Sequence, residues 1–161
     1  PADQLILEVT EGIVVGNRDG TIAHMQELAA MGIRFSIDDF GTGYSNLAYL
    51  KRMPLYELKI DKSFIREMPG DADGTAIVCS ILAMAAHLRL RVVAEGVETE
   101  EQAGFLAANG APHMQGYLFA RPMELGDVLV ALEDLKGAVD VGRLDGHCGP
   151  VSPGISALIP A

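Results

Sequence analysis

Short apolar runs alternate along the chain with longer segments of helical periodicity. The runs are nearly continuous and rich in β-branched residues, which is typical of parallel strands covered on both faces. The strand candidates are residues 5–10, 34–38, 56–60, 91–95 and 114–118. The helix candidates are residues 20–31, 44–52, 73–88, a segment that opens at Thr99 and stops before Gly110, and residues 124–135. This alternation predicts parallel α/β architecture, either a barrel or a wound sheet.

Several of the predicted helices carry end signals. Gly32 can adopt the left-handed conformation that closes the first helix, and Pro54 follows the second. The third helix is expected to begin near Asp73. Thr99 and Gln102 have the spacing of a capping box, in which each side chain accepts a bond from the other residue's backbone N–H.

Beyond Lys136 the chain changes character. Glycine and proline recur there and no apolar period is sustained. Such a composition is typical of a segment that does not pack into a core. We therefore expect one domain over residues 1–136 and a flexible tail over residues 137–161.

The composition, with 49% hydrophobic and 21% charged residues, is that of a soluble globular protein. The formal charge of −10 argues against a polymeric nucleic-acid partner, because such partners need a surface of lysine and arginine. A small anionic ligand stays compatible with this charge if metal ions supply the positive charge. The longest apolar stretch, residues 76–86, is too short to cross a bilayer, so we expect no membrane contact from this segment.

The cysteines and helical histidines do not have the spacing of a metal site. Cys79 and Cys148 are far apart in the sequence, and Cys79 lies in an apolar helical run. We therefore predict that Cys79 is a buried free thiol. His24 and His87 fall in predicted helices, and we assign both to packing or to the surface.

Two adjacent acids, Asp38 and Asp39, close the second strand candidate and open a loop that contains Gly41 and Gly43. Neighbouring carboxylates repel each other unless a cation neutralises them or one stays protonated, so the pair indicates a divalent-metal site. The alternative is a solvated acidic loop. Functional polar groups also stand in or just after the other strand candidates: Glu8 and Glu11, Lys59 and Asp61, Glu95, and Gln115.

Five segments that carry these polar residues occur in an order that resembles one family. They are Glu-Val-Thr-Glu, Asp-Asp-Phe-Gly-Thr-Gly-Tyr-Ser, Leu-Lys-Ile-Asp-Lys-Ser-Phe, Val-Ala-Glu-Gly-Val-Glu-Thr and Gln-Gly-Tyr-Leu-Phe-Ala-Arg-Pro. Together they resemble the EAL domain, the phosphodiesterase module that hydrolyses bacterial cyclic di-GMP, over about residues 1–136. The Glu-Ala-Leu segment that names the family is expected upstream of Glu8 and is not among these residues.

The resemblance implies a fold. The EAL domain is similar to the (β/α)8 barrel, which needs about 250 residues. The five strand candidates then correspond to an α/β, partial TIM-like barrel made of the last five β/α units. Side chains at the carboxyl ends of its strands would share one mouth.

The resemblance also implies the metal ligands. Glu8 and Asp38 would bind metal, with Asp38 as the bridge, and Asp39 would complete the second site. Two Mg²⁺ or Mn²⁺ ions about 3.5–4 Å apart can activate water and stabilise phosphoryl charge.

Further roles are implied for catalysis and for the loop. Lys59 would bond the attacking water or the phosphate, Asp61 would orient Lys59 or a metal-bound water, and Glu95 would be a general base or a ligand of the second metal. Gln115 would bind substrate and Glu11 would brace the glycine loop. Two neighbouring positions have other interpretations: Glu98 fits a cap or brace as well as a functional group, and Tyr117 is expected in the core. Pro112 stands where the family commonly has an acid.

These expectations favour a cyclic di-GMP phosphodiesterase that cuts one phosphodiester bond and releases the linear dinucleotide pGpG. This chain alone would be an incomplete and inactive fragment of it. The first alternative is a degenerate EAL module that binds cyclic di-GMP or a protein without turnover, and the second is a truncated gene product without a function of its own. The resemblance further implies a cytoplasmic location, a homodimer, and an upstream sensory or cyclase domain in the full-length protein.

Overall fold

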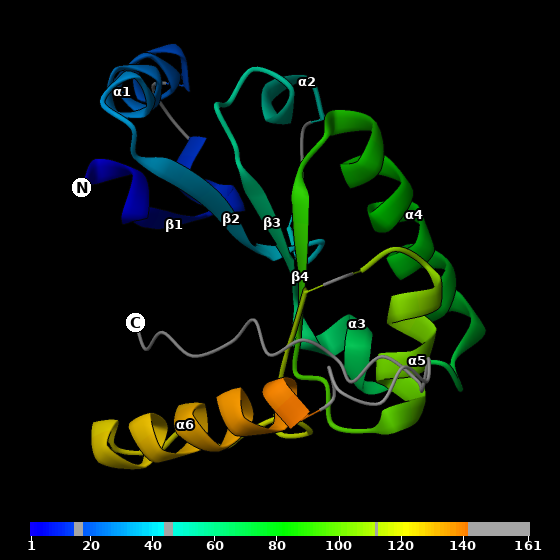
Figure 1. Ribbon diagram of the computed structural model, residues 1–161. Helices are drawn as coiled ribbons and strands as arrows, with labels where there is room; N and C mark the ends of the chain where they lie inside the picture. Colours follow the sequence, from blue (N-terminus) through cyan, green and yellow to red (C-terminus); the bar gives the residue numbers. More distant parts are fainter. Residues whose placement is uncertain (15–17, 44–46, 112, 142–161) are drawn as a thin grey trace.

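Five parallel strands form one sheet in the order in which they occur along the chain (Figure 1). The computed structural model describes residues 1–14, 18–43, 47–111 and 113–141. The strands are β1 (Ile6–Thr10), β2 (Arg34–Phe40), β3 (Glu57–Ile60), β4 (Arg91–Glu95) and β5 (His113–Gln115). Within the described residues the sheet does not close on itself, which fits a partial barrel and confirms the predicted fold class.

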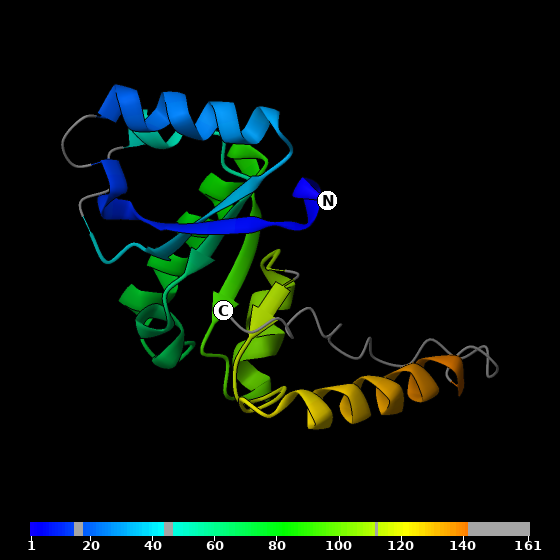
Figure 2. The ribbon, with the colours of Figure 1, turned by 90° about the vertical axis from the view of Figure 1, so that its left-hand side faces the viewer.

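Helices connect successive strands, as parallel pairing requires. They are α1 (Arg18–Ala30), α2 (Leu47–Leu50), α3 (Lys62–Arg66), α4 (Ala72–Leu88), α5 (Glu100–Ala108) and α6 (Leu125–Val141), with short 3₁₀ segments η1 (Ala2–Gln4) and η2 (Glu11–Val14). α1 packs against β2, whereas α4 packs against β3 and β4. α6 leads away from the sheet (Figure 2). Every helix in the described part of the chain is too short or too polar to span a membrane.

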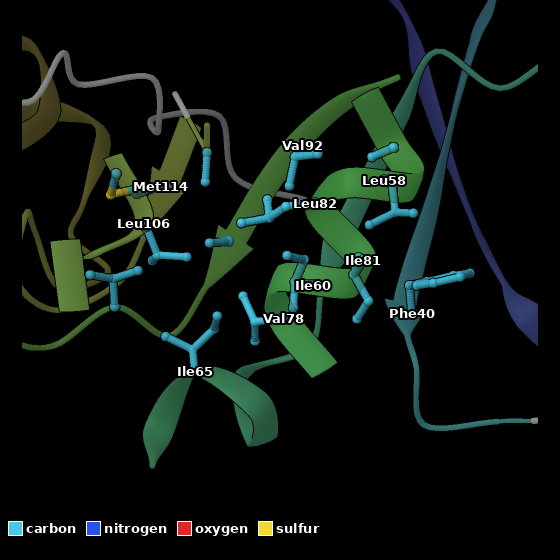
Figure 3. Close-up of a cluster of buried hydrophobic side chains, with 14 of the residues drawn as sticks. Phe40, Leu58, Ile60, Ile65, Val78, Ile81, Leu82, Val92, Leu106 and Met114 are labelled. Atoms are coloured by element: carbon cyan, nitrogen blue, oxygen red, sulfur yellow. The ribbon is translucent and has the colours of Figure 1, made fainter. Parts of the chain in front are cut away.

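The main core lies between the helix-facing side of the sheet and α3, α4 and α5 (Figure 3). Leu58 and Ile60 of β3 are fully buried there, as are Val78 of α4 and Leu106 of α5. A second apolar cluster joins β1 and β2 to α1: Val9, Ile22, Met25, Phe35 and Met53. Burial of these side chains stabilises each by about 1.5–3 kcal/mol relative to exposure, which holds the helices on this face.

The side chains that these strands direct to the other face of the sheet, away from the main core, include polar groups. Successive side chains of a strand point to opposite faces, so Glu57 and Lys59 share the face that Leu58 does not use. The register places Ser36 beside Glu8 on one side and beside Glu57 on the other. The polar groups of neighbouring strands are therefore brought together on one face of the sheet.

Several predicted ends are confirmed. The capping box is present: Gln102 N donates to Thr99 Oγ1 at 3.2 Å and Thr99 N donates to Gln102 Oε1 at 3.1 Å. Gly32 has φ of 101°, the left-handed conformation expected of it. α4 begins slightly before the predicted residue, because Asp71 is its N-cap and accepts a bond from Gly74 N at 2.6 Å.

Other local predictions were wrong. β5 ends at Gln115, because the chain turns at Gly116 and Leu118 N donates to Val97 O at 3.0 Å. Tyr117 is consequently 54% exposed and lies under the Arg121 guanidinium instead of in the core. Cys79 is half-buried, not buried, although its thiol is free.

Two helices also differ from the sequence pattern. α3 was not predicted, and it is capped by Asp61, which accepts a bond from Ser63 N at 2.9 Å. α6 continues past residue 135 to Val141, into the segment expected to be tail. The boundary of the domain at residue 136 stays a prediction, and Cys148 and Pro112 lie outside the described residues.

Candidate active site

The ammonium group of Lys59 is the centre of a charged cluster at the carboxyl ends of four neighbouring strands. Its Nζ forms ion pairs with carboxylates on three of them: 2.9 Å from Glu8 Oε1, 3.1 Å from Asp38 Oδ1 and 2.8 Å from Glu95 Oε1. These residues come from β3, β1, β2 and β4 respectively. Residues far apart in sequence thus meet at one end of the sheet, as the barrel-like topology predicts.

Burial within this cluster is uneven. The Lys59 side chain is 11% exposed and that of Glu95 is 19% exposed, whereas that of Glu8 is 49% exposed. Burial opposes the charge on Lys59, but the hydrogen bonds that its ammonium donates to Glu95 and the other two carboxylates outweigh burial and raise the pKa of Lys59 above its ordinary value. Burial raises the pKa of Glu95, although Lys59 opposes the increase. The cluster therefore holds a protonated amine beside a carboxylate that takes up a proton more readily than usual.

Asp39 follows Asp38 in a strained backbone conformation. Its φ is 52°, in the left-handed region that residues other than glycine rarely adopt, and its N–H donates to Asp38 Oδ1 at 3.0 Å. The charge of Asp38, then burial and the charge of Asp61, raise the pKa of the Asp39 carboxyl. Repulsion between these acids is the electrostatic condition under which a cation binds favourably.

Asp61 is held by the helix that it caps. Its Oδ1 accepts from Ser63 N at 2.9 Å and from Ser63 Oγ at 2.5 Å. Burial tends to raise the pKa of Asp61, but the bonds from Ser63 prevail and the pKa is lowered. Asp61 makes no ion pair with Lys59 in the described part of the chain, so its expected role toward Lys59 stays a prediction.

The donor set fits a hard divalent cation. Asp38, Asp39 and Glu95 each offer a carboxylate oxygen, and these oxygens lie within 4.8 Å of one another. Mg²⁺ and Mn²⁺ prefer oxygen ligands of this kind. Glu8 is outside this group, but it shares Lys59 with two of its members.

Glu11 lies against the loop that follows β2. Its Oε1 accepts a hydrogen bond from Gly41 N at 2.9 Å. A Cβ at Gly43 would stand 2.5 Å from Glu11 Oε2, so the loop passes close to the carboxylate. Gly41 has φ of 102° and faces Phe64, whose ring would be 2.7 Å from an added Cβ. The structure thus places Glu11 where a brace for this loop would stand.

Gln115 is exposed at the end of β5, where the register pairs it with Glu95. The next residue, Gly116, allows the chain to pass against Val97, because a Cβ there would lie 2.1 Å from Val97 O. Gln115 is therefore held beside the Glu95 strand, although it does not contact Lys59 in the described residues.

The remaining sequence candidates lie away from this cluster. Glu98 is exposed, and its backbone N–H donates to Gln102 Oε1 at 2.8 Å. His24 and His87 are exposed on α1 and α4, which selects the surface from the two assignments, packing or surface, that the sequence left open.

Sequence reasoning missed a second polar layer deeper along the strands. Arg91 on β4 approaches His113 Nε2 to 2.9 Å through Nη2 and also bonds the Tyr56 hydroxyl. Arg34 lies over the Tyr56 ring at 4.6 Å. Because arginine only donates, His113 Nε2 must accept. Burial and then Arg91 lower the pKa of His113, despite the opposing charge of Glu57.

A signal for this layer does exist in the sequence. Glu57 stands two residues before Lys59, His113 two before Gln115, and Arg91 four before Glu95. An even spacing on a strand places such residues on the same face as the active-site group that follows.

Parallel β/α units with a polar cluster at the carboxyl ends of the strands are the arrangement of barrel-type β/α domains, of which the described sheet is an open part. A family model, the EAL domain, matches residues 1–122, and the chain belongs to the EAL domain family.

Two curated relatives from Pseudomonas aeruginosa illustrate this membership. NbdA, a cyclic di-GMP phosphodiesterase, is 52% identical over 134 residues, which are 83% of this chain and 17% of NbdA. MucR, a bifunctional diguanylate cyclase and cyclic di-GMP phosphodiesterase, is 50% identical over 128 residues, which are 80% of this chain and 19% of MucR. This chain therefore spans about a fifth of the length of these relatives.

Solved structures agree with the sequence comparison. The MucR phosphodiesterase in complex with c-di-GMP superposes with a TM-score of 0.75 at 50% identity, covering 79% of this chain and 51% of that one. A manganese and cy-diGMP complex of Klebsiella pneumoniae BlrP1 has a TM-score of 0.69 at 38% identity, covering 75% of this chain and 31% of that one. The described residues thus share the fold of about half of the MucR chain.

Proposed function

We propose that this chain is the carboxyl-terminal part of a phosphodiesterase that hydrolyses cyclic di-GMP to pGpG with two divalent metal ions. The observation that carries the proposal is the convergence of Glu8, Asp38 and Glu95 on Lys59 at the carboxyl ends of four strands. In β/α barrels the functional side chains stand at the carboxyl ends of the strands, which is where this cluster lies. Relatives that act on cyclic di-GMP support the choice of substrate.

The proposal assigns metal binding to residues that offer carboxylate oxygens as ligand atoms. Asp38, Asp39 and Glu95 would hold a divalent cation, and Glu8 stands beside them as a further ligand. When bound, such ions activate water and neutralise charge on the phosphoryl oxygens. Manganese in the BlrP1 complex supports Mg²⁺ or Mn²⁺ as the cofactor.

The chain's own polar groups supply the remaining steps. Lys59 donates hydrogen bonds to the scissile phosphate or to the attacking water. Glu95 accepts a proton from that water as the alternative to its role as a metal ligand, and burial raises its pKa above the ordinary value. Asp61 helps to orient the water, while Gln115 binds the nucleotide beside Glu95. Glu11 keeps the loop after Asp39 in place through Gly41.

The proposal extends to the whole protein. The cyclase function in the name of MucR supports a sensory or cyclase domain upstream of this chain. A homodimer and a cytoplasmic location complete the proposed setting. The described sheet is open, so we expect this chain alone to turn over little or no substrate.

A second function is favoured by one observation. Lys59 stands at the centre of the site and pairs with three carboxylates, and an ammonium there can also hold a phosphate, which suits a module that binds cyclic di-GMP and does not hydrolyse it. The two functions differ in one measurement: the second predicts that the full-length protein binds the dinucleotide in calorimetry but releases no pGpG with Mg²⁺ or Mn²⁺.

The experiment that tests the enzyme is Asp38→Asn in the full-length protein. The substitution keeps the shape of the side chain but removes a charged ligand, so pGpG release measured by chromatography should fall by orders of magnitude. Asp19→Asn is the matched control, because the Asp19 side chain is 77% exposed and pairs with Arg52 away from the site. Full metal-dependent turnover in Asp38→Asn would refute the two-metal assignment.

A further inference from the structure

Lys59 uses its entire hydrogen-bonding capacity on the acids of the site. An ammonium group has three N–H donors, and three carboxylates surround Lys59 Nζ at 2.8–3.1 Å. The side chain is 11% exposed, so water replaces little of this interaction. The nitrogen therefore stands where carboxylates from three strands converge, which is the place that a cation would otherwise take.

The same acids are shared between Lys59 and the proposed metal site. Asp38 and Glu95 each form an ion pair with Lys59, and both belong to the three-carboxylate group that could hold a metal. Asp39, the third member, makes no ion pair with the amine in the described part of the chain, and its N–H donates to Asp38 Oδ1 at 3.0 Å. A divalent ion bound by Asp38 and Glu95 would thus come within a few ångströms of Nζ, with the same sign of charge.

We propose that Lys59 is a built-in competitor of the metal: its ammonium neutralises Asp38 and Glu95 and must withdraw from them when a divalent ion binds. This inference rests on the proposed function, because it assumes that the acids are metal ligands. Lys59 then acts twice, as the counter-ion that keeps four strands together without metal and as the donor to phosphate or water after loading. It lowers the affinity for metal while it stabilises the metal-free chain.

Two opposite effects follow from removing this charge. Lys59→Met keeps most of the length of the side chain but leaves the carboxylates to repel one another, so the metal-free chain should unfold at a lower temperature. The dissociation constant for Mn²⁺ should fall roughly tenfold or more, the scale expected when a like charge within about 4 Å is removed from a partly screened site. The increase in Tm caused by Mn²⁺ should be correspondingly larger.

The test is a calorimetric Mn²⁺ titration of the 161-residue chain after chelator treatment, in wild type, Lys59→Met and Lys51→Met. Lys51 is exposed and outside the site, so it controls for the loss of any lysine charge. Tighter binding by Lys59→Met, with Lys51→Met unchanged, supports the competition. Equal or weaker binding by a folded Lys59→Met chain overturns it.

A second measurement keeps the inference testable if Lys59→Met does not fold. The side-chain ammonium of Lys59 in the wild-type chain can be followed by NMR during a Mg²⁺ titration. Its protons should exchange slowly without metal and rapidly at saturation, because the ion pairs are released. Unchanged exchange at saturation overturns the competition, whereas absence of metal binding in both the 161-residue chain and the full-length protein overturns the metal-dependent part of the proposed function itself.

Discussion

Gly116 stands at a point where the chain leaves no room for a side chain. A Cβ at this position would lie 2.1 Å from Val97 O and 2.3 Å from Val97 N, both of which are backbone atoms. Val97 is fully buried, so it has no space into which it could withdraw. Gly116→Ala must therefore displace the segment after β5 relative to the segment after β4.

The cost of this displacement can be worked from the contacts that it breaks. Overpacking costs about 1–3 kcal/mol. Val97 N donates to Gln115 O and Leu118 N donates to Val97 O, both at 3.0 Å. At about 1 kcal/mol for each of these two bonds, Gly116→Ala should lower the free energy of unfolding by about 3–5 kcal/mol in total. That is a large part of the 5–15 kcal/mol typical of a domain.

Urea unfolding of the 161-residue chain, followed by far-ultraviolet circular dichroism, measures this change. Gly104→Ala is the matched control, because an added Cβ at Gly104 meets nothing within 4 Å in helix α5. The control should be more stable by about 0.5–1 kcal/mol, since alanine favours a helix interior over glycine. Unfolding free energies of Gly116→Ala and wild type that agree within about 0.5 kcal/mol would refute the reasoning, because that difference is far below the expected loss of about 3–5 kcal/mol.

Two further predictions address the loop brace and the deeper polar layer. Glu11→Ala removes the carboxylate that accepts from Gly41 N, so it should cost about 1.5–3 kcal/mol of stability and impair turnover of the full-length protein, while Mn²⁺ affinity in calorimetry stays near that of wild type. An affinity loss as complete as that of Glu8→Ala would show instead that Glu11 is a ligand. The second prediction follows from the lowered pKa of His113: the unfolded chain binds the proton more readily, so stability in urea should decrease as pH falls below about 6.5. His113→Gln should reduce this acid sensitivity, and an identical pH profile in the two chains would exclude His113 as its source.

Much of the fold could be predicted because its signals are local. Parallel strands leave continuous apolar runs, and capping residues such as Thr99 and Gln102 satisfy backbone groups within a few residues of themselves. The ordered motifs likewise identified the family without any contact between them. Errors arose where contacts between distant segments decided the outcome. β5 ends at Gln115, earlier than predicted, because the backbone of Val97 bonds Gln115 O and Leu118 N at that point.

The residue types of the site were also visible in the sequence, but their arrangement was not. Nothing in the spacing of Glu8, Asp38 and Glu95 shows that all three meet at one amine. The strand register and the burial of Lys59 decide this, because they bring together side chains that are tens of residues apart and remove most of the water that would screen them. The sequence by itself determined the elements and the chemical inventory, whereas the tertiary structure decided which charges are neighbours, since electrostatic interaction depends on distance and solvent access and not on order along the chain.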